Sequence, residues 1–313
     1  MSEAPGFRHL PVLYEQTLAA LAIRPGGSYA DGTIGGGGHS AGILERLGES
    51  GRLFGIDRDR EALTAAGKRL GDDPRLRLIQ GNFHDVKALL PGIRLNGALL
   101  DLGVSSWQLD SPERGFSYHA DAPLDMRMDQ SGGVTAAQWL NDEDESTIRD
   151  ALYAYADERW AARIARVILE MRREKPFETT GDLVRAVDRA IPRAVRQKEE
   201  GHPARRTFQA VRIAVNDEIA PLEQALEDWV EMLAPGGRLA VISFHSIEDR
   251  VVKRTFKRLE TGCVCPPKLP VCVCGKKPLL RLPKGYPQAA AAAEAAENPR
   301  ARSAKLRVAE KLA

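Results

Sequence analysis

Short apolar runs alternate with stretches of helical periodicity over the first third of the chain. Each run is bounded by polar or turn-forming residues, a pattern that is typical of a parallel sheet with helices on both faces. The sequence therefore predicts half of a doubly wound α/β sheet. The expected strands cover 28–31, 52–57, 76–80 and 97–102, and the expected helices lie near 40–47, 58–70 and 85–90.

The pattern changes at about residue 110. From there to about 203 the chain is rich in Arg, Ala and Glu, with helical periodicity and no convincing strand. An amphipathic helix is expected over 207–233. A strand is then expected over 238–243, a helix over 247–259 and a last strand over 303–310. We therefore expect one α/β domain built from 1–110 and 203–313, interrupted by an inserted helical substrate-recognition domain over 111–202.

A glycine-rich loop follows the first expected strand. It reads Asp31-Gly-Thr-Ile-Gly-Gly-Gly-Gly-His39 and lies where open α/β sheets bind nucleotide-like cofactors. Four consecutive glycines let a ligand approach the backbone closely, although a plain turn would look similar. The loop also fits the loose dinucleotide pattern, so an NAD-dependent oxidoreductase is an alternative. Asp31 favours S-adenosylmethionine, because a carboxylate attracts its ammonium and sulfonium and repels a pyrophosphate.

Two further aspartates end expected strands. Asp57 ends the second strand, at the position where an acidic side chain can accept bonds from both hydroxyls of a ribose. Asp101 ends the fourth strand, at the sheet edge where reacting groups of such folds collect. Each could instead only cap a helix or order a turn.

Charge is distributed unevenly along the chain. From Arg250 onward there are 15 Lys/Arg against 4 Asp/Glu, whereas the preceding residues hold 30 against 39. The stretch from Arg159 to Arg206 is also basic, with 13 Lys/Arg against 7 Asp/Glu. Such segments indicate a polyanionic partner, although solvated surfaces have the same composition. A module that binds RNA without catalysis is therefore a second alternative.

The cysteines and the hydropathy bear on location. No stretch approaches the roughly 18 apolar residues of a membrane span, and the first residues lack a signal-peptide pattern, so we expect a cytoplasmic protein without membrane contact. All four cysteines (Cys263, Cys265, Cys272 and Cys274) lie in one short segment, which fits a reducing compartment. Two C-x-C pairs could surround one zinc ion, but this spacing is less diagnostic than C-x-x-C. The sequence thus predicts reduced thiols and no metal.

Motifs along nearly the whole chain resemble the MraW family of ribosomal RNA small-subunit methyltransferases H. Many long matches in the same order make coincidence implausible. The matching stretches are His9-Leu-Pro-Val-Leu13, Asp31-Gly-Thr33, Gly37-Gly-His39, Gly55-Ile-Asp-Arg-Asp59, Leu99 to Ser106, Gln108-Leu-Asp110, Arg114-Gly-Phe-Ser-Tyr118, Pro123-Leu-Asp-Met-Arg-Met128, Arg206-Thr-Phe-Gln-Ala-Val-Arg-Ile213, Ser243-Phe-His-Ser246, Glu248-Asp-Arg250 and Glu297-Asn-Pro-Arg-Ala-Arg-Ser303.

The resemblance implies an α/β, class I (Rossmann-like) S-adenosylmethionine-dependent methyltransferase. Its substrate would be the exocyclic N4 of a cytosine in the decoding region of 16S ribosomal RNA, free or within the 30S subunit. Phe83 would pack against the adenine face of the donor, although by itself it reads as a core aromatic. The resemblance places donor contacts at Gly37, Gly38, His39, Asp57, Phe83, Asp101 and Gln108.

The implied reaction needs a proton acceptor, because the lone pair of a cytosine amino group is delocalised into the ring. The chain has no obvious Asn/Asp-Pro-Pro-Tyr/Phe motif, so Asp101 and His245 are the candidates. His245 follows an expected strand and could instead be a hydrogen-bonded structural histidine. The stretch from Arg114 to Tyr118 offers an Arg, a Phe and a Tyr that could hold an extruded base.

Overall fold

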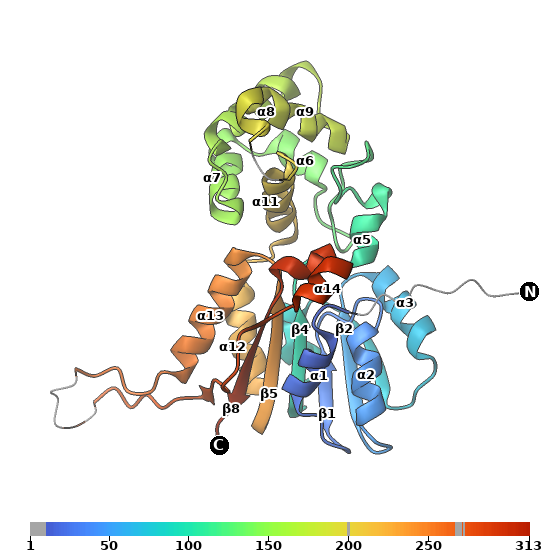
Figure 1. Ribbon diagram of the computed structural model, residues 1–313, viewed down its shortest axis with the longest axis vertical. Helices are drawn as coiled ribbons and strands as arrows, with labels where there is room; N and C mark the ends of the chain where they lie inside the picture. The colour runs from blue at the N-terminus through green and yellow to red at the C-terminus, as the bar shows by residue number, and fades with distance from the viewer. Residues whose placement is uncertain (1–10, 199–200, 267–270, 272) are drawn as a thin grey trace, which may run out of the picture. The chain divides into compact units, whose positions relative to one another are not determined.

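A computed structural model describes residues 11–198, 201–266, 271 and 273–313 (Figure 1). The chain forms two compact units. The first comprises Met1–Gly103 and Pro221–Ala313, and the second comprises Val104–Ala220. Within the described residues, no helix is both long and apolar enough to cross a bilayer.

The first unit is built on one sheet. Its strands lie in the order β3-β2-β1-β4-β5-β8-β6, with β7 also paired to β8. Neighbours from β3 to β5 are parallel, and β8 runs antiparallel to β5. The strands are β1 Ser28–Asp31, β2 Arg52–Asp57, β3 Leu76–Gln80, β4 Leu95–Asp101, β5 Leu233–Ser243, β6 Leu280–Arg281, β7 Gln288–Ala289 and β8 Lys305–Lys311.

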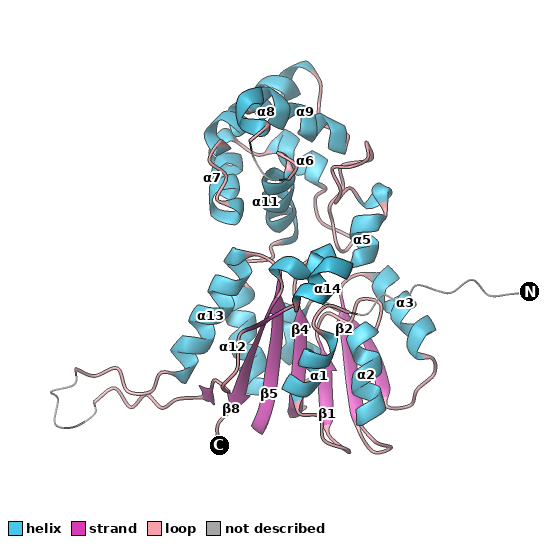
Figure 2. Ribbon diagram, in the orientation of Figure 1, coloured by secondary structure: helices cyan, strands magenta, loops and turns pink. Residues whose placement is uncertain are grey.

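Helices cover the sheet on both sides, as Figure 2 shows. This arrangement follows from the strands themselves, because β4 and β5 carry consecutive buried residues and must be covered on both faces. The elements are α1 Tyr14–Leu21, α2 Gly38–Arg46, α3 Arg60–Leu70, η1 Phe83–Asp85, α4 Val86–Leu89, α12 Leu222–Met232, α13 Ser246–Glu260, α14 Ala292–Glu297 and η3 Pro299–Ser303.

The strand order reverses direction between β1 and β4. In open α/β sheets the crevice outside the carboxyl ends of the strands at such a point is where ligands bind. The loops that follow β1, β2 and β4 all leave this edge of the sheet, since the strands are parallel. The predicted fold class, an α/β Rossmann-like sheet of the class I methyltransferase type, is therefore confirmed.

The second unit is helical and has its own core. Leu152, Ile164, Leu183 and Phe208, each from a different helix, belong to one buried cluster. Several helices begin at capping side chains, such as Thr135 and Thr179. The elements are α5 Ser106–Asp110, η2 Pro112–Arg114, α6 Ala136–Asp142, α7 Glu145–Ala156, α8 Ala161–Glu174, α9 Thr180–Ala190, α10 Arg193–Arg196 and α11 Arg205–Asn216.

The helix expected over 207–233 is two helices, α11 and α12. Asp217 ends α11 in the left-handed conformation with φ 47°, and Pro221 immediately precedes α12. α11 packs against α7 and so belongs to the second unit, which comprises Val104–Ala220, whereas the sequence placed the limits of the insertion at 111 and 202. Periodicity alone does not show which core an amphipathic helix joins.

Candidate functional site

The loop between β1 and α2 depends on glycine at several positions. Gly35 and Gly37 have φ of 51° and 76°, the left-handed region that favours glycine. At Gly38 an added Cβ would lie 2.4 Å from Cγ of Pro11, whereas one at Gly36 would meet nothing within 4 Å. Part of the loop is therefore packed closely against its surroundings and part is open for a ligand to approach its backbone.

Asp57 ties the end of β2 to this loop. Its Oδ2 accepts a hydrogen bond from the backbone N–H of Gly35 at 2.9 Å, and its Oδ1 accepts one from Asp59 N–H at 2.9 Å. Burial raises the pKa of Asp57 above its ordinary value. Each carboxylate oxygen has a further lone pair, so Asp57 can order the loop and still accept a hydroxyl group.

Asp31 does not have the role that its sequence position suggested. It is 1% exposed, its Oδ2 accepts the Ser40 hydroxyl at 2.8 Å, and its Oδ1 accepts Thr33 N–H at 3.3 Å. Burial raises its pKa to about 6. Asp31 is therefore a buried residue that holds the glycine loop in place through Thr33 and Ser40. It is not a carboxylate at the mouth of the loop.

His39 is a buried neutral imidazole. Its Nε2 lies 3.1 Å from the backbone carbonyl oxygen of Val12, and since a carbonyl only accepts, we assign the ring proton to Nε2. Burial lowers the pKa of His39 to about 4, so the ring is neutral at pH 7. The other nitrogen, Nδ1, then carries a lone pair and lies 3.7 Å from Oδ2 of Asp101, too far for a hydrogen bond.

Asp101 lies beside His39 and the glycine loop. Its backbone N–H donates to the Thr33 hydroxyl at 2.6 Å, which links the end of β4 to the glycine loop. The side chain is 27% exposed, and within the described part of the chain its buried Oδ1 has no hydrogen-bond partner. Burial, and then the carboxylates of Asp31 and Glu248, raise the pKa of Asp101 well above its usual range. A cation or a hydrogen-bond donor from a ligand would stabilise the buried negative charge and supply the missing hydrogen bond.

Phe83 lies in η1, after β3. Its side chain is only partly buried, so Phe83 is not a core aromatic residue. Its ring meets that of His84 edge-on, with 4.2 Å between centroids. Its carbonyl accepts a hydrogen bond from Nε1 of the fully buried Trp229 at 2.9 Å. Trp229 has no motif that marks it in the sequence, yet it fixes the backbone from which Phe83 projects.

Gln108 belongs to the second unit, whereas the other six candidate donor residues belong to the first. It is buried and forms a capping box at the start of α5. Its Oε1 accepts the backbone N–H of Ser105 at 3.0 Å, and its own N–H donates to the Ser105 hydroxyl. Both of these hydrogen bonds of Gln108 stabilise the start of its own helix.

His245 is the N-cap of α13. Its Nδ1 accepts the backbone N–H of Glu248 at 3.4 Å. Its Nε2 lies 3.0 Å from Oε1 of Glu248 without hydrogen-bond geometry, and Oε2 of that residue accepts Phe244 N–H at 2.8 Å. The ring is therefore held at the helix start, which favours the structural reading of His245.

In the second unit, two of the residues expected to hold an extruded base are interior. Arg114 is 2% exposed and donates through Nη2 to the carbonyls of Arg127 and Met128, and Phe116 is also buried. Tyr118 is only partly buried, and its ring stacks on His202 with centroids 4.5 Å apart. The pairing of Tyr118 with His202 has no local sequence signal, because 84 residues separate the two rings.

The basic segments differ in how far their charge is neutralised. In the C-terminal part of the chain, Arg307 pairs with Asp249 at 2.6 Å, and Arg238 and Arg281 both pair with Glu310. On α8, Arg166 and Arg173 are exposed, and neither forms an ion pair with any described residue. The second unit therefore retains uncompensated positive charge on one helix.

Comparisons with known proteins agree with this geometry. The model of the MraW methylase family matches residues 6–312. Relatives named ribosomal RNA small subunit methyltransferase H include that of Symbiobacterium thermophilum, 54% identical over 98% of this chain and 97% of the relative. Another, from Heliobacterium modesticaldum, is 52% identical over 98% of this chain and 99% of the relative. The chain therefore belongs to the MraW methylase family, and the S-adenosylmethionine-dependent methyltransferase activity expected from its sequence is confirmed.

Proposed function

We propose that this methyltransferase modifies the exocyclic N4 of a cytosine in the decoding region of 16S ribosomal RNA, and that it does so in the cytoplasm. The names of the relatives support small-subunit ribosomal RNA as the substrate, and the motif resemblance supports the cytosine amino group. The observation that carries the chemistry is the carboxylate of Asp101 beside the glycine loop, whose buried Oδ1 has no hydrogen-bond partner among the described residues. Neither an NAD-dependent oxidoreductase nor a binding module without catalysis is favoured.

Residues of the first unit fit the donor. The open backbone at Gly36 and the turn through Gly37 and Gly38 would accommodate its close approach, with Asp57 accepting the ribose hydroxyls and Phe83 packing on the adenine. Asp101 Oδ2 and the Nδ1 lone pair of His39 would both accept hydrogen bonds from its ammonium. The resemblance also implies a donor contact at Gln108. When bound, S-adenosylmethionine supplies an electrophilic methyl group.

Asp101 is the proton acceptor in this proposal. A cytosine amino group gives up one proton on methylation, and the carboxylate of Asp101 accepts it. The donor ammonium would hold this carboxylate in its ionised form, which is the form that can accept a proton. We assign this role to Asp101 rather than to His245, because Nδ1 of His245 already accepts a backbone N–H and its Nε2 lies 3.0 Å from Oε1 of Glu248.

Undermethylated 30S subunits from a deletion strain test the proposed reaction. Purified protein and tritiated S-adenosylmethionine should place one methyl group on the N4 of a cytosine in the decoding region, as located by mass mapping of nuclease fragments. NAD should neither bind nor replace the donor. Label on another base, or no label in RNA while the protein binds the donor, would contradict the proposal.

Donor affinity should depend on pH through Asp101. The donor ammonium favours the ionised carboxylate, whose pKa is raised in the free protein, so binding should release a proton and weaken as pH falls through that raised pKa, by up to about tenfold per pH unit. His39, with its pKa at about 4, stays neutral above about pH 5 and adds nothing there. Calorimetry in buffers of different ionisation enthalpy measures the release, and Asp101→Asn should abolish it. A release that persists in this variant would rule out Asp101 as its source.

Two exposed arginines of α8 should contribute to RNA binding. Arg166 and Arg173 lie seven residues apart on one helix face, and removal of each arginine that neutralises a phosphate should reduce the slope of log K against log salt by about 0.7–0.9. Arg166→Glu/Arg173→Glu should therefore bind 30S subunits more weakly and with a shallower salt dependence in filter binding. Arg149→Glu is the matched control, because Arg149 already pairs with Asp150 at 2.8 Å. An unchanged slope in the double variant would show that this face does not touch RNA.

A further inference from the structure

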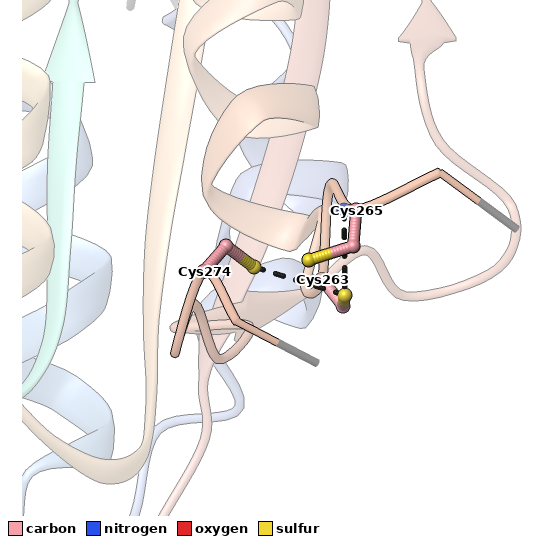
Figure 3. Close-up of side chains that lie close together, drawn as sticks. All are labelled: Cys263, Cys265 and Cys274. Atoms are coloured by element: carbon pink, nitrogen blue, oxygen red, sulfur yellow. Dashed lines mark hydrogen bonds between the residues drawn. The ribbon is translucent and has the colours of Figure 1, made fainter. Parts of the chain in front are cut away.

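Three cysteines after α13 bring their sulfur atoms together. The Sγ atoms of Cys263, Cys265 and Cys274 all lie within 4.8 Å of one another, and those of Cys263 and Cys274 are 3.7 Å apart (Figure 3). A Zn–S bond is about 2.3 Å, so two sulfurs on a tetrahedral zinc ion are about 3.8 Å apart. The spacing matches two ligands of one ion and is far longer than the about 2.05 Å of a disulfide.

A backbone N–H contacts one of these sulfurs, as is common at metal-bound cysteines. The backbone N–H of Cys265 donates to Sγ of Cys263 at 3.4 Å, a contact that stabilises negative charge on a ligand sulfur. Between Glu260 and Glu294 the sequence has no acidic residue, whereas Lys276 and Lys277 closely follow Cys274. Thiolates are therefore the anionic ligands of this segment, and thiolates select zinc among the common divalent ions.

The described valines beside these cysteines are not packed in a core. Val264 and Val273 are 60% and 79% exposed. The two ends of the segment are joined by one hydrogen bond, in which Leu279 N–H donates to the Leu259 carbonyl at 2.9 Å. A loop that buries so little apolar surface needs another source of order, and a bound metal supplies one in small elements without a core.

We propose that Cys263, Cys265 and Cys274 form a structural zinc site. Three thiols lose their protons and form three Zn–S bonds, and a ligand outside these three completes the tetrahedron. The site orders the segment between α13 and β6 and takes no part in methyl transfer. It replaces the expectation of metal-free thiols, while Cys272, the fourth cysteine of the predicted cluster, lies outside the described residues.

Elemental analysis of the full-length protein, purified without chelator, tests the site. The expected content is about one zinc per chain, as for a single tetrahedral site, and each of Cys263→Ser, Cys265→Ser and Cys274→Ser should lose most of it. Val273→Ser is the matched control, because it places the same residue in the same segment without removing a thiol, and it should keep its zinc. Donor binding by calorimetry should be unchanged in all four variants, which shows that they are folded.

Cobalt provides a second readout. Co²⁺ added to metal-free protein should produce an intense thiolate-to-metal charge-transfer band, which the three cysteine variants should lack. The proposal is overturned if the wild-type protein takes up neither zinc nor cobalt, or if the cysteine variants hold as much of either metal as Val273→Ser does. A metal-free protein in which Cys263 and Cys274 are disulfide-linked under reducing conditions would overturn it as well.

Discussion

Asp101→Asn is expected to lower kcat by about 10²–10⁴-fold at saturating donor, the range that general-base catalysis contributes. Asparagine keeps the shape of the side chain, but its amide cannot take a proton from the cytosine amino group. Among the described residues the carboxylate Oδ1 has no hydrogen-bond partner, so the substitution breaks no existing hydrogen bond of that atom. Transfer of tritiated methyl groups to undermethylated 30S subunits measures the effect.

His245→Asn is the matched comparison for that result. Asparagine is a good N-cap residue, so this variant removes the imidazole while it keeps a cap for α13, at the position where Nδ1 now accepts Glu248 N–H. Its kcat should stay close to that of the wild type. Assignment of the proton acceptor to Asp101 fails if Asp101→Asn turns over normally, or if His245→Asn loses as much activity as Asp101→Asn.

Asp57→Ala is expected to weaken binding of S-adenosylmethionine by about 1–3 kcal/mol, because the charge-assisted hydrogen bonds to the ribose hydroxyls are removed. Part of this effect is local, because Asp57 also accepts the Gly35 N–H and holds the glycine loop in place. Calorimetric titration with the donor measures it. Unchanged affinity would remove Asp57 from the donor site.

Asp59→Ala separates donor binding from general loss of stability. Asp59 is the N-cap of α3, and its side chain accepts Glu61 N–H at 3.0 Å. Loss of an N-cap should cost about 0.5–2 kcal/mol of stability. Thermal unfolding should therefore shift in this variant while donor affinity stays near that of the wild type. Equal losses of affinity in both variants would mean that Asp57 acts only through the fold.

Much of the first unit could be predicted because its signals are local. A strand buried on both faces reads as an apolar run wherever it lies, and the expected ranges 28–31 and 52–57 coincide with β1 and β2. The expected range 76–80 coincides with β3, a strand at the edge of the sheet. The glycine loop is local too, since left-handed turns such as Gly35 and Gly37 exclude most other residues.

Tertiary contacts decided which buried polar side chains have hydrogen-bond partners within the described residues. Asp31 and Asp101 both end parallel strands, but Ser40 and Thr33 satisfy the carboxylate of Asp31, whereas Oδ1 of Asp101 is buried without a partner. His39 is neutral because it is buried beside the Val12 carbonyl, 27 residues earlier in the chain. The spacing of residue types along the chain does not contain this information.

The sequence by itself determined the class of sheet, the strands at its centre, the position of the glycine loop and, through its motifs, the family. Only the tertiary structure decided that Arg114 is interior, that α11 belongs to the helical unit and that three sulfurs converge after α13. The physical reason is that hydrophobic periodicity records which face of an element is buried. The partner of each buried polar group is supplied by segments that are distant in the chain and meet only on folding.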